Sequence, residues 1–279
     1  MPGFLKIILY QPLVNALIFF YRLFGNFGWA VIILTILIRL LMIPLTVPSL
    51  KAATKLKELA PELEKLKKKF AKDKQKLAQA QLELYKKHGA NPAAGCLPQI
   101  IQLVILITFY QAFSQVLKTD GSVITKLNEV LYSSLRLPEQ TVINTQFTYL
   151  DLNKPDVFRL PGFSFPLPGI FLIAAALIQF ISAKMMYPAA EAAQKQAAKT
   201  PGKKDDLATA MQTQMLYFFP LMTILIGFSF PSGLVLYWLV FSLFTAVQQY
   251  FVSGWGGLEP WLKKIRPKAG PPLAEKLKS

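Results

Sequence analysis

The sequence has almost none of the residues that metal centres and many enzymes depend on. A single cysteine (Cys96) and a single histidine (His88) occur in 279 residues, which excludes a disulfide framework and a multi-ligand cysteine/histidine metal site. No aspartate or glutamate lies within any long apolar segment, so aspartyl proteolysis and carboxylate proton relays inside a membrane lack their residues. A serine/histidine dyad is excluded there as well, because His88 lies outside those segments. We expect no enzyme activity, no cofactor and no metal.

What the chain has in abundance is apolar sequence. Hydrophobic residues make up 53% of it, and five segments approach the roughly 20 apolar residues that cross a bilayer. We expect transmembrane helices at 27–50, 95–117, 168–187, 211–230 and 231–252. The predicted fold is an all-α polytopic membrane protein with a five-transmembrane-helix core.

The charges between these helices predict the orientation. Segment 51–94 holds twelve lysines against five acidic residues, 188–210 holds four against three, and the tail 253–279 has six basic residues against two. Loop 118–167 is balanced, with five of each sign. Since basic segments stay in the cytoplasm, we expect the N-terminus and loop 118–167 outside, and the other three segments inside.

The N-terminal residues 1–26 are apolar but interrupted. Pro12 breaks the run, and it carries the polar residues Lys6, Gln11, Asn15 and Arg22. We expect an extracytoplasmic interfacial amphipathic helix rather than a cleaved signal. A sixth span is the alternative, and it would invert the orientation deduced from charge.

Segment 51–94 predicts an antiparallel helical hairpin in the cytoplasm. Apolar residues recur three or four positions apart in its first half, with Lys and Glu between them, and form a seam: Leu56, Leu59, Leu63, Leu66 and Phe70. A turn is expected at 71–73, and a second helix that ends near Gly89. The lysines form either a solvated face or a docking surface for anionic lipids, ribosomal RNA or an acidic partner, and the basic tail leaves the same choice open.

Arg39 is the costly residue of the first span. It lies about 15 Å along the helix from Trp29, near the middle of a bilayer. Burying a guanidinium there costs roughly 2.5–3.5 kcal/mol, so such a residue is functional by default. Lys184, by contrast, lies near a helix end, from which we expect it to snorkel to the headgroups.

Uncharged polar residues recur on the spans around Arg39. Thr35 lies one turn before it, Gln99 and Gln102 share a face of the second span, and Gln179 is on the third. The fifth span carries a polar stripe of Trp238, Ser242, Thr245 and Gln249. Each alone fits an interhelical hydrogen bond of about 0.6 kcal/mol. Together, around an arginine without a carboxylate partner, they favour a hydrated cavity of positive potential.

Several motifs in this order resemble the YidC family of membrane protein insertases. They are Leu34-Thr35-Ile36-Leu37-Ile38-Arg39 with Pro44-Leu45-Thr46, the lysine-rich hairpin with Leu84-Tyr85-Lys86, Asn91-Pro92-Ala93-Ala94-Gly95-Cys96-Leu97-Pro98 with Gln102, and Phe230-Pro231-Ser232-Gly233-Leu234-Val235-Leu236-Tyr237-Trp238 with Gln248-Gln249. The similarity covers about residues 1–255. The chain resembles the compact type without the large extracytoplasmic domain, and departs from the pattern at Ala60, before Pro61, where a polar residue is common.

The resemblance implies an insertase and chaperone in the bacterial plasma membrane. Its hydrophilic groove would open to the cytoplasm and to lipid and be closed towards the outside. The groove arginine falls on Arg39. The expected groove residues are Arg39, Thr35, Gln102, Gln179, Trp238 and Ser242. Implied partners are nascent membrane proteins, the ribosome through the basic tail and hairpin, the Sec translocon, the signal recognition particle pathway and anionic lipids. A small-anion channel or transporter subunit is the alternative, and a chaperone that assembles helices without inserting them is another.

Overall fold

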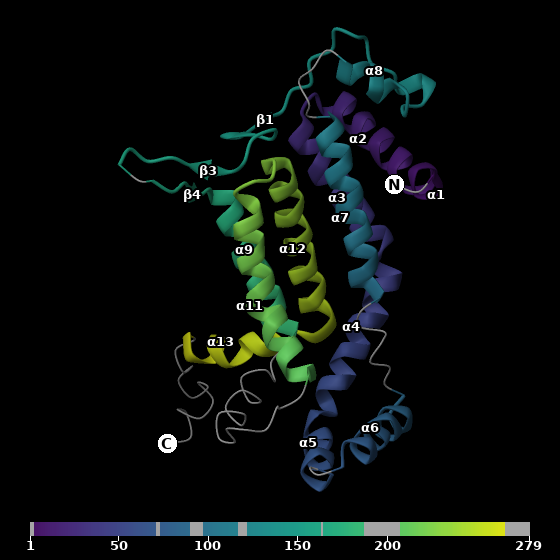
Figure 1. Ribbon diagram of the computed structural model, residues 1–279, viewed down its shortest axis with the longest axis vertical. Helices are drawn as coiled ribbons and strands as arrows, with labels where there is room; N and C mark the ends of the chain where they lie inside the picture. Colours follow the sequence, from purple (N-terminus) through teal and green to yellow (C-terminus); the bar gives the residue numbers. More distant parts are fainter. Residues whose placement is uncertain are drawn as a thin grey trace, which may run out of the picture.

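The structure, a computed structural model, describes residues 3–70, 73–89, 97–116, 122–162, 164–186 and 207–265. Most of the predicted loop 188–210, the tail after 265, the turn residues 71–72 and Cys96 lie outside the described residues. The described chain is mainly a bundle of long helices, with small helices and β-hairpins at one end (Figure 1). Three shorter helices lie at the other end: Ala60–Lys69, Lys74–Lys87 and Glu259–Ile265. We name the end where α3 (Phe27–Leu41), α9 (Ile170–Met186) and α12 (Ser232–Ser253) begin the loop end. The opposite end, which carries the helical hairpin of residues 60–87, is the hairpin end.

The first predicted span, 27–50, is a bent pair of helices. α3 (Phe27–Leu41) is capped by Asn26, whose side chain accepts hydrogen bonds from the backbone N–H groups of Gly28 (2.9 Å) and Trp29 (3.4 Å). α4 (Ile43–Glu58) follows at an angle of 62°. Pro44 explains the bend, because it has no N–H to donate and its ring crowds the carbonyl four residues earlier.

Four more helices correspond to the remaining predicted spans. They are α7 (Leu97–Val116), α9 (Ile170–Met186), α11 (Leu207–Gly227) and α12 (Ser232–Ser253). α12 is central: it packs against α3, α4, α7 and α9, while α11 packs against α9. Aromatic rings join the core across helices, with Phe27 5.6 Å from Phe113 and Phe109 4.4 Å from Tyr237 between ring centroids.

Length and composition leave the number of spans open. Among the described residues, Lys6–Phe24 and Ser232–Val252 are each long and apolar enough to cross a bilayer, and the α3–α4 pair can supply a third span. Three further apolar helices are shorter: Ile100–Val116, Ile170–Met185 and Leu216–Gly227. The count of five therefore stays a prediction.

The N-terminal segment is one nearly continuous helix, formed by α1 (Gly3–Leu5), a π-helical stretch (Lys6–Tyr10) and α2 (Gln11–Phe24). It ends at Gly25, whose φ of 65° suits glycine at the close of a helix. In Figure 1, α2 runs obliquely to α3 and reaches the loop end. Polar contacts hold it there: the buried Asn15 amide donates to the Val130 carbonyl (2.9 Å) and accepts from the Tyr132 N–H (2.7 Å).

The predicted hairpin consists of α5 (Ala60–Lys69) and α6 (Lys74–Lys87). The predicted apolar seam does not lie on a single helix. α4 ends at Glu58, and α5 begins after Leu59 with Pro61 in its first turn. Asp73 caps α6 by accepting from the Lys76 N–H at 3.0 Å. His88, after α6, lies 3.6 Å from the Glu62 carboxylate at the start of α5, so the two helices run in opposite directions.

Loop 118–167 contains more structure than its composition indicated. α8 (Ser122–Asn128) and a 3₁₀ turn (Ser133–Leu135) precede two small antiparallel hairpins. β1 (Gln146–Phe147) pairs with β2 (Leu150–Asp151), and β3 (Val157–Phe158) pairs with β4 (Leu167–Pro168). Strands of two residues carry too little periodicity to be read from sequence.

The chain after α12 turns across the bundle. A 3₁₀ turn (Gly256–Leu258) leads into α13 (Glu259–Ile265), which lies crosswise at the hairpin end (Figure 1). Trp261 of α13 covers Lys184 of α9, with the ammonium 4.7 Å from the ring centroid. Lys184 is only 3% exposed. The expectation that it snorkels outward is therefore wrong, because α13 packs over it.

Candidate functional site

Arg39 lies near the end of α3, one turn before the bend, and it points to α12. Its Nη2 donates to Thr245 Oγ1 at 2.6 Å and to Gln248 Oε1 at 3.4 Å. The guanidinium carbon lies 4.4 Å from the ring centroid of Phe241 and 5.3 Å from that of Phe244. Arg39 is 9% exposed, and its Nε has no hydrogen-bond partner among the described residues.

Among the residues that the structure describes, only neutral groups therefore solvate the charge of Arg39. Hydroxyl, amide and aromatic faces stabilise a guanidinium, but none of them cancels its charge. Within the described residues, no carboxylate forms an ion pair with Arg39. The site keeps a net positive charge, and an acidic group brought next to it would find a strong and incompletely satisfied donor.

Gln248 and Thr46 extend this cluster across the bend. The Gln248 amide donates to Thr46 Oγ1 at 2.6 Å, and the Thr46 hydroxyl lies 3.0 Å from the Met42 carbonyl, to which it donates. Gln248 and Thr46 are both buried, at 8% and 6% exposure. The cluster thus joins α3, α12 and α4.

The other predicted groove residues form separate pairs. On α7, Gln102 donates to the Tyr237 hydroxyl of α12 at 2.6 Å. On α9, Gln179 accepts from Thr223 of α11 at 2.7 Å. The structure therefore brings each glutamine to a neighbouring helix, and neither of them to Arg39.

Thr35, Ser242 and Trp238 take different places. The Thr35 hydroxyl donates to the Val31 carbonyl of its own helix at 2.6 Å. The backbone carbonyl of Ser242 accepts from Ser182 of α9 at 3.2 Å. Trp238 is half-buried and packs against both hydrophobic clusters of the bundle.

The polar stripe predicted on α12 has partners on two helices. The backbone carbonyl of Ser242 bonds to Ser182 of α9, whereas the side chains of Thr245, Phe241 and Gln248 contact Arg39 of α3. With 3.6 residues per turn, residues 241, 245 and 248 lie on one side of the helix. Sequence reasoning chose the stripe by polarity and so passed over Phe241, which the same spacing places beside Thr245, and Phe244, whose ring also lies near Arg39.

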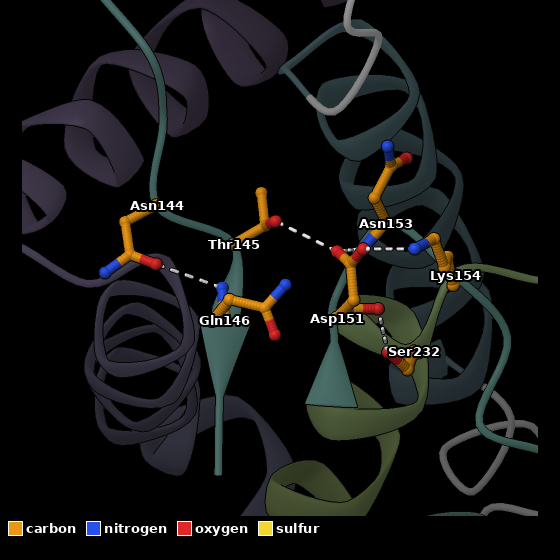
Figure 2. Close-up of polar contacts among 7 residues, drawn as sticks. All are labelled: Asn144, Thr145, Gln146, Asp151, Asn153, Lys154 and Ser232. Carbon is orange, nitrogen blue, oxygen red and sulfur yellow. Dashed lines mark hydrogen bonds and ion pairs between the residues drawn. The ribbon is translucent and has the colours of Figure 1, made fainter. Parts of the chain in front are cut away.

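The loop end is closed around the starts of α12 and α9. Figure 2 shows the Asp151 carboxylate between Thr145 on one side and Asn153 and Lys154 on the other, with Ser232 of α12 below. Thr145 donates to Asp151 at 2.9 Å, Lys154 lies 3.1 Å from it, and the Ser232 hydroxyl donates to the Asp151 carbonyl at 3.0 Å. Burial raises the pKa of Asp151, but the hydrogen bonds from Lys154, Thr145 and Asn153 outweigh it, so the pKa lies below its ordinary value.

A second carboxylate holds the start of α9. Asp156, 2% exposed, accepts from the Tyr149 hydroxyl at 2.9 Å and from the Leu172 N–H at 2.8 Å. Burial raises the pKa of Tyr149, which keeps its hydroxyl a donor. Gly169 lies so close that a Cβ there would collide with the Asp156 carboxylate.

The described residues contain no group of three or more His, Cys, Asp or Glu side chains placed to hold a metal ion.

A family model described as 60Kd inner membrane protein matches residues 19–256. The membrane protein insertase YidC of Fusobacterium nucleatum is 34% identical over 229 residues, which are 82% of this chain and 86% of that protein. The chain belongs to the YidC family.

Members of the family differ in length. The chain is 33% identical over 248 residues to membrane protein insertase YidC 1 of Halalkalibacterium halodurans, covering 76% of it. It is 30% identical over 250 residues to the YidC of Rickettsia felis, but spans only 39% of that protein. A crystal structure of an active YidC insertase with its first transmembrane domain resolved matches 90% of this chain and 48% of its own, with a TM-score of 0.52 and 26% identity.

Proposed function

We propose that this chain inserts small membrane proteins through a hydrophilic, positively charged intramembrane groove whose charge is Arg39. The observation that carries the proposal is a buried arginine, on an apolar helix, whose partners Thr245, Gln248, Phe241 and Phe244 are all uncharged. Burying such a charge in a membrane is costly, and a transient acidic ligand from a client gives it a use.

The problem that an insertase solves is the transfer of a short polar segment across hydrocarbon. Its backbone and charges lose water there at a cost of several kcal/mol per unsatisfied group. A groove that admits water from the cytoplasm to the level of Arg39 shortens the dry path. Gln102, Gln179 and Thr35, with Trp238 and Ser242, are proposed to line it as predicted.

An exposed apolar face supports a route for the client's hydrophobic helix. On α7, large apolar side chains recur three or four residues apart and are 41–58% exposed: Ile100, Leu103, Ile107 and Tyr110. This spacing places them on one face. The client helix would move along such a face into lipid, driven by about 25 cal/mol per Å² of apolar surface removed from water. This needs no nucleotide hydrolysis.

The closed loop end supports a groove with one polar opening. Loop residues 144–169 are hydrogen-bonded onto the starts of α9 and α12, and α2 is bound to residues 130–136. We place this end outside the cell and the hairpin end in the cytoplasm, with the C-terminus inside. There the basic hairpin and tail would meet the ribosome or anionic lipids, and the Sec translocon and signal recognition particle pathway would deliver clients.

The proposal is tested by two substitutions of Arg39. Arg39→Ala should abolish insertion of a small client with acidic residues in its external tail, and Arg39→Lys should largely retain it, because the lysine keeps the charge. Insertion is measured by protease protection of the client tail in proteoliposomes containing the purified chain.

A client whose tail acids are replaced by Asn and Gln is the matched control, and Arg39→Ala should impair it far less. Normal insertion of the acidic client by Arg39→Ala would refute the charge mechanism. Anion flux through the same proteoliposomes without a client would instead favour the channel alternative.

A further inference from the structure

Gln248 of α12 lies between the two halves of the bent helix pair. Its Oε1 accepts from Arg39 on α3, and its Nε2 donates to Thr46 on α4. Thr46 in turn donates to the carbonyl of Met42, the residue at the bend. A continuous path of hydrogen bonds therefore runs from the Arg39 guanidinium to the bend and into α4.

The carboxamide of Gln248 meets both demands of this place without changing the charge. It offers an acceptor oxygen and a donor nitrogen in one planar group, and both ends are used here. Apolar side chains offer neither, and a carboxylate offers acceptors only and would cancel the charge of Arg39. Gln248 is 8% exposed, so water does not readily replace a lost partner.

We propose that Gln248 is a positioning residue that fixes the Arg39 guanidinium and the α3–α4 bend relative to each other on α12. This rests on the proposed function, in which Arg39 binds the client. A client carboxylate that draws the guanidinium away competes with Gln248 for the same Nη2. Because coupling between two binding events is reciprocal, client binding at Arg39 weakens the contact of Gln248 with Thr46 on α4. α4 continues in the chain into α5 and α6.

Insertion by four variants gives the first test. Gln248→Leu, which keeps the size and the Arg39 charge, should lower insertion of the acidic-tailed client roughly three- to tenfold, the effect of about one net hydrogen bond. Thr46→Val should act in the same direction, and Thr46→Ser should restore the wild-type rate. The Gln248→Leu/Thr46→Val double variant should be no worse than the worse single variant, because both break one path.

The sign of the charge separates positioning from general stability. Gln248→Glu should lower insertion of the acidic client as strongly as Arg39→Ala does, while the client with a neutral tail is inserted as by wild type. Gln111→Leu is the matched control: it makes the same change at a half-buried glutamine of α7, outside the Arg39 cluster. It should leave insertion unchanged.

A distance between α4 and α12 gives a readout independent of insertion. Spin labels at Lys51→Cys and Phe251→Cys, both exposed positions, in a Cys96→Ser background should show one narrow distance distribution. Gln248→Leu and Thr46→Val should broaden or shift it, and Thr46→Ser should not.

The outcomes separate this proposal from the proposed function. If Gln248→Leu changes neither the distance distribution nor insertion while Arg39→Ala still blocks insertion, the positioning role is wrong and the insertase mechanism stands. Equal loss with acidic and neutral clients at an unchanged distance also overturns it. If Arg39→Ala inserts normally, the charge mechanism fails, and the distance measurement alone decides whether Gln248 holds the bend.

Discussion

Buried polar side chains decide which helices are held together. Arg39, Gln248 and Asn15 each lie in apolar surroundings and each bonds to another element. An unpaired group in such a place costs about 1–3 kcal/mol, so each position tolerates few substitutions. Asp156 shows the same principle at the loop end, where its two oxygens bind Tyr149 and the start of α9.

Removing the Asp156 carboxylate should destabilise the docked loop. Asp156→Ala leaves the Leu172 N–H without its acceptor and should cost about 0.5–2 kcal/mol, as for other helix caps. Thermal unfolding in detergent measures the loss. Gly169→Ala should act in the same direction, because its Cβ collides with Asp156. Glu139→Ala, at an exposed loop position, should change nothing; an Asp156→Ala protein as stable as wild type would contradict the capping role.

At the scale of elements, the β1–β2 hairpin is joined to α12 by a few polar contacts around Asp151. The Ser232 N–H donates to the Lys154 carbonyl at 2.8 Å and the Gly233 N–H to the Leu152 carbonyl at 3.1 Å. These bonds satisfy N–H groups that a helix start leaves free. A hairpin this short is not stable alone. The Asp151 carboxylate binds Thr145, Asn153 and Lys154 and so holds the carbonyls that face α12, and we expect docking to depend on Asp151 staying ionised.

Docking of this hairpin should weaken in acid. The pKa of Asp151 is lowered in the folded protein, so the stabilisation is present above the ordinary carboxyl pKa and is lost as the pH falls through the lowered value. Hydrogen exchange of residues 145–154 should therefore accelerate in acid, after correction for the intrinsic rate. Asp151→Asn should show much less of this pH dependence, and an equal dependence in both proteins would rule Asp151 out as the cause.

At the scale of the whole molecule, the position of the N-terminal helix decides the topology. Lys6–Phe24 is long and apolar enough to span. Yet Tyr10 donates to Gln115, next to the last residue of α7, and Asn15 and Arg22 bind loop backbone between 130 and 136. The hydrogen bonds that Tyr10, Asn15 and Arg22 make to other elements thus all lead to the loop end. This supports a helix lying across that end.

Labelling should place both ends of this helix on the same side of the membrane. In a Cys96→Ser background, a membrane-impermeant maleimide added outside intact cells should modify Lys6→Cys and Leu23→Cys, both exposed. Lys51→Cys, expected inside, should react only after permeabilisation. If Lys6→Cys behaves like Lys51→Cys, the helix spans the membrane and the orientation deduced from charge must be revised.

Much of the architecture follows from the sequence, because it depends on local properties. The apolar runs predict the helices α7, α9, α11 and α12 to within a few residues, since a long apolar run bounded by polar or turn residues favours a helix. The motif around Arg39 indicates the family, and the comparisons confirm it. The division of 51–94 into helices is less well predicted, because Pro61 restarts the helix within an unbroken apolar seam.

The sequence by itself determined that Arg39 is costly and that no predicted span contains an aspartate or glutamate, because composition and spacing suffice to show both. Only the tertiary structure decided its partners. The packing of α12 on α3 decides which face of α12 meets Arg39. That face carries Thr245 and Gln248, and Arg39 bonds to these two residues rather than to Ser242 or Trp238. The 62° bend then brings Thr46 of α4 to the same amide, a contact between residues about 200 positions apart that no local pattern specifies.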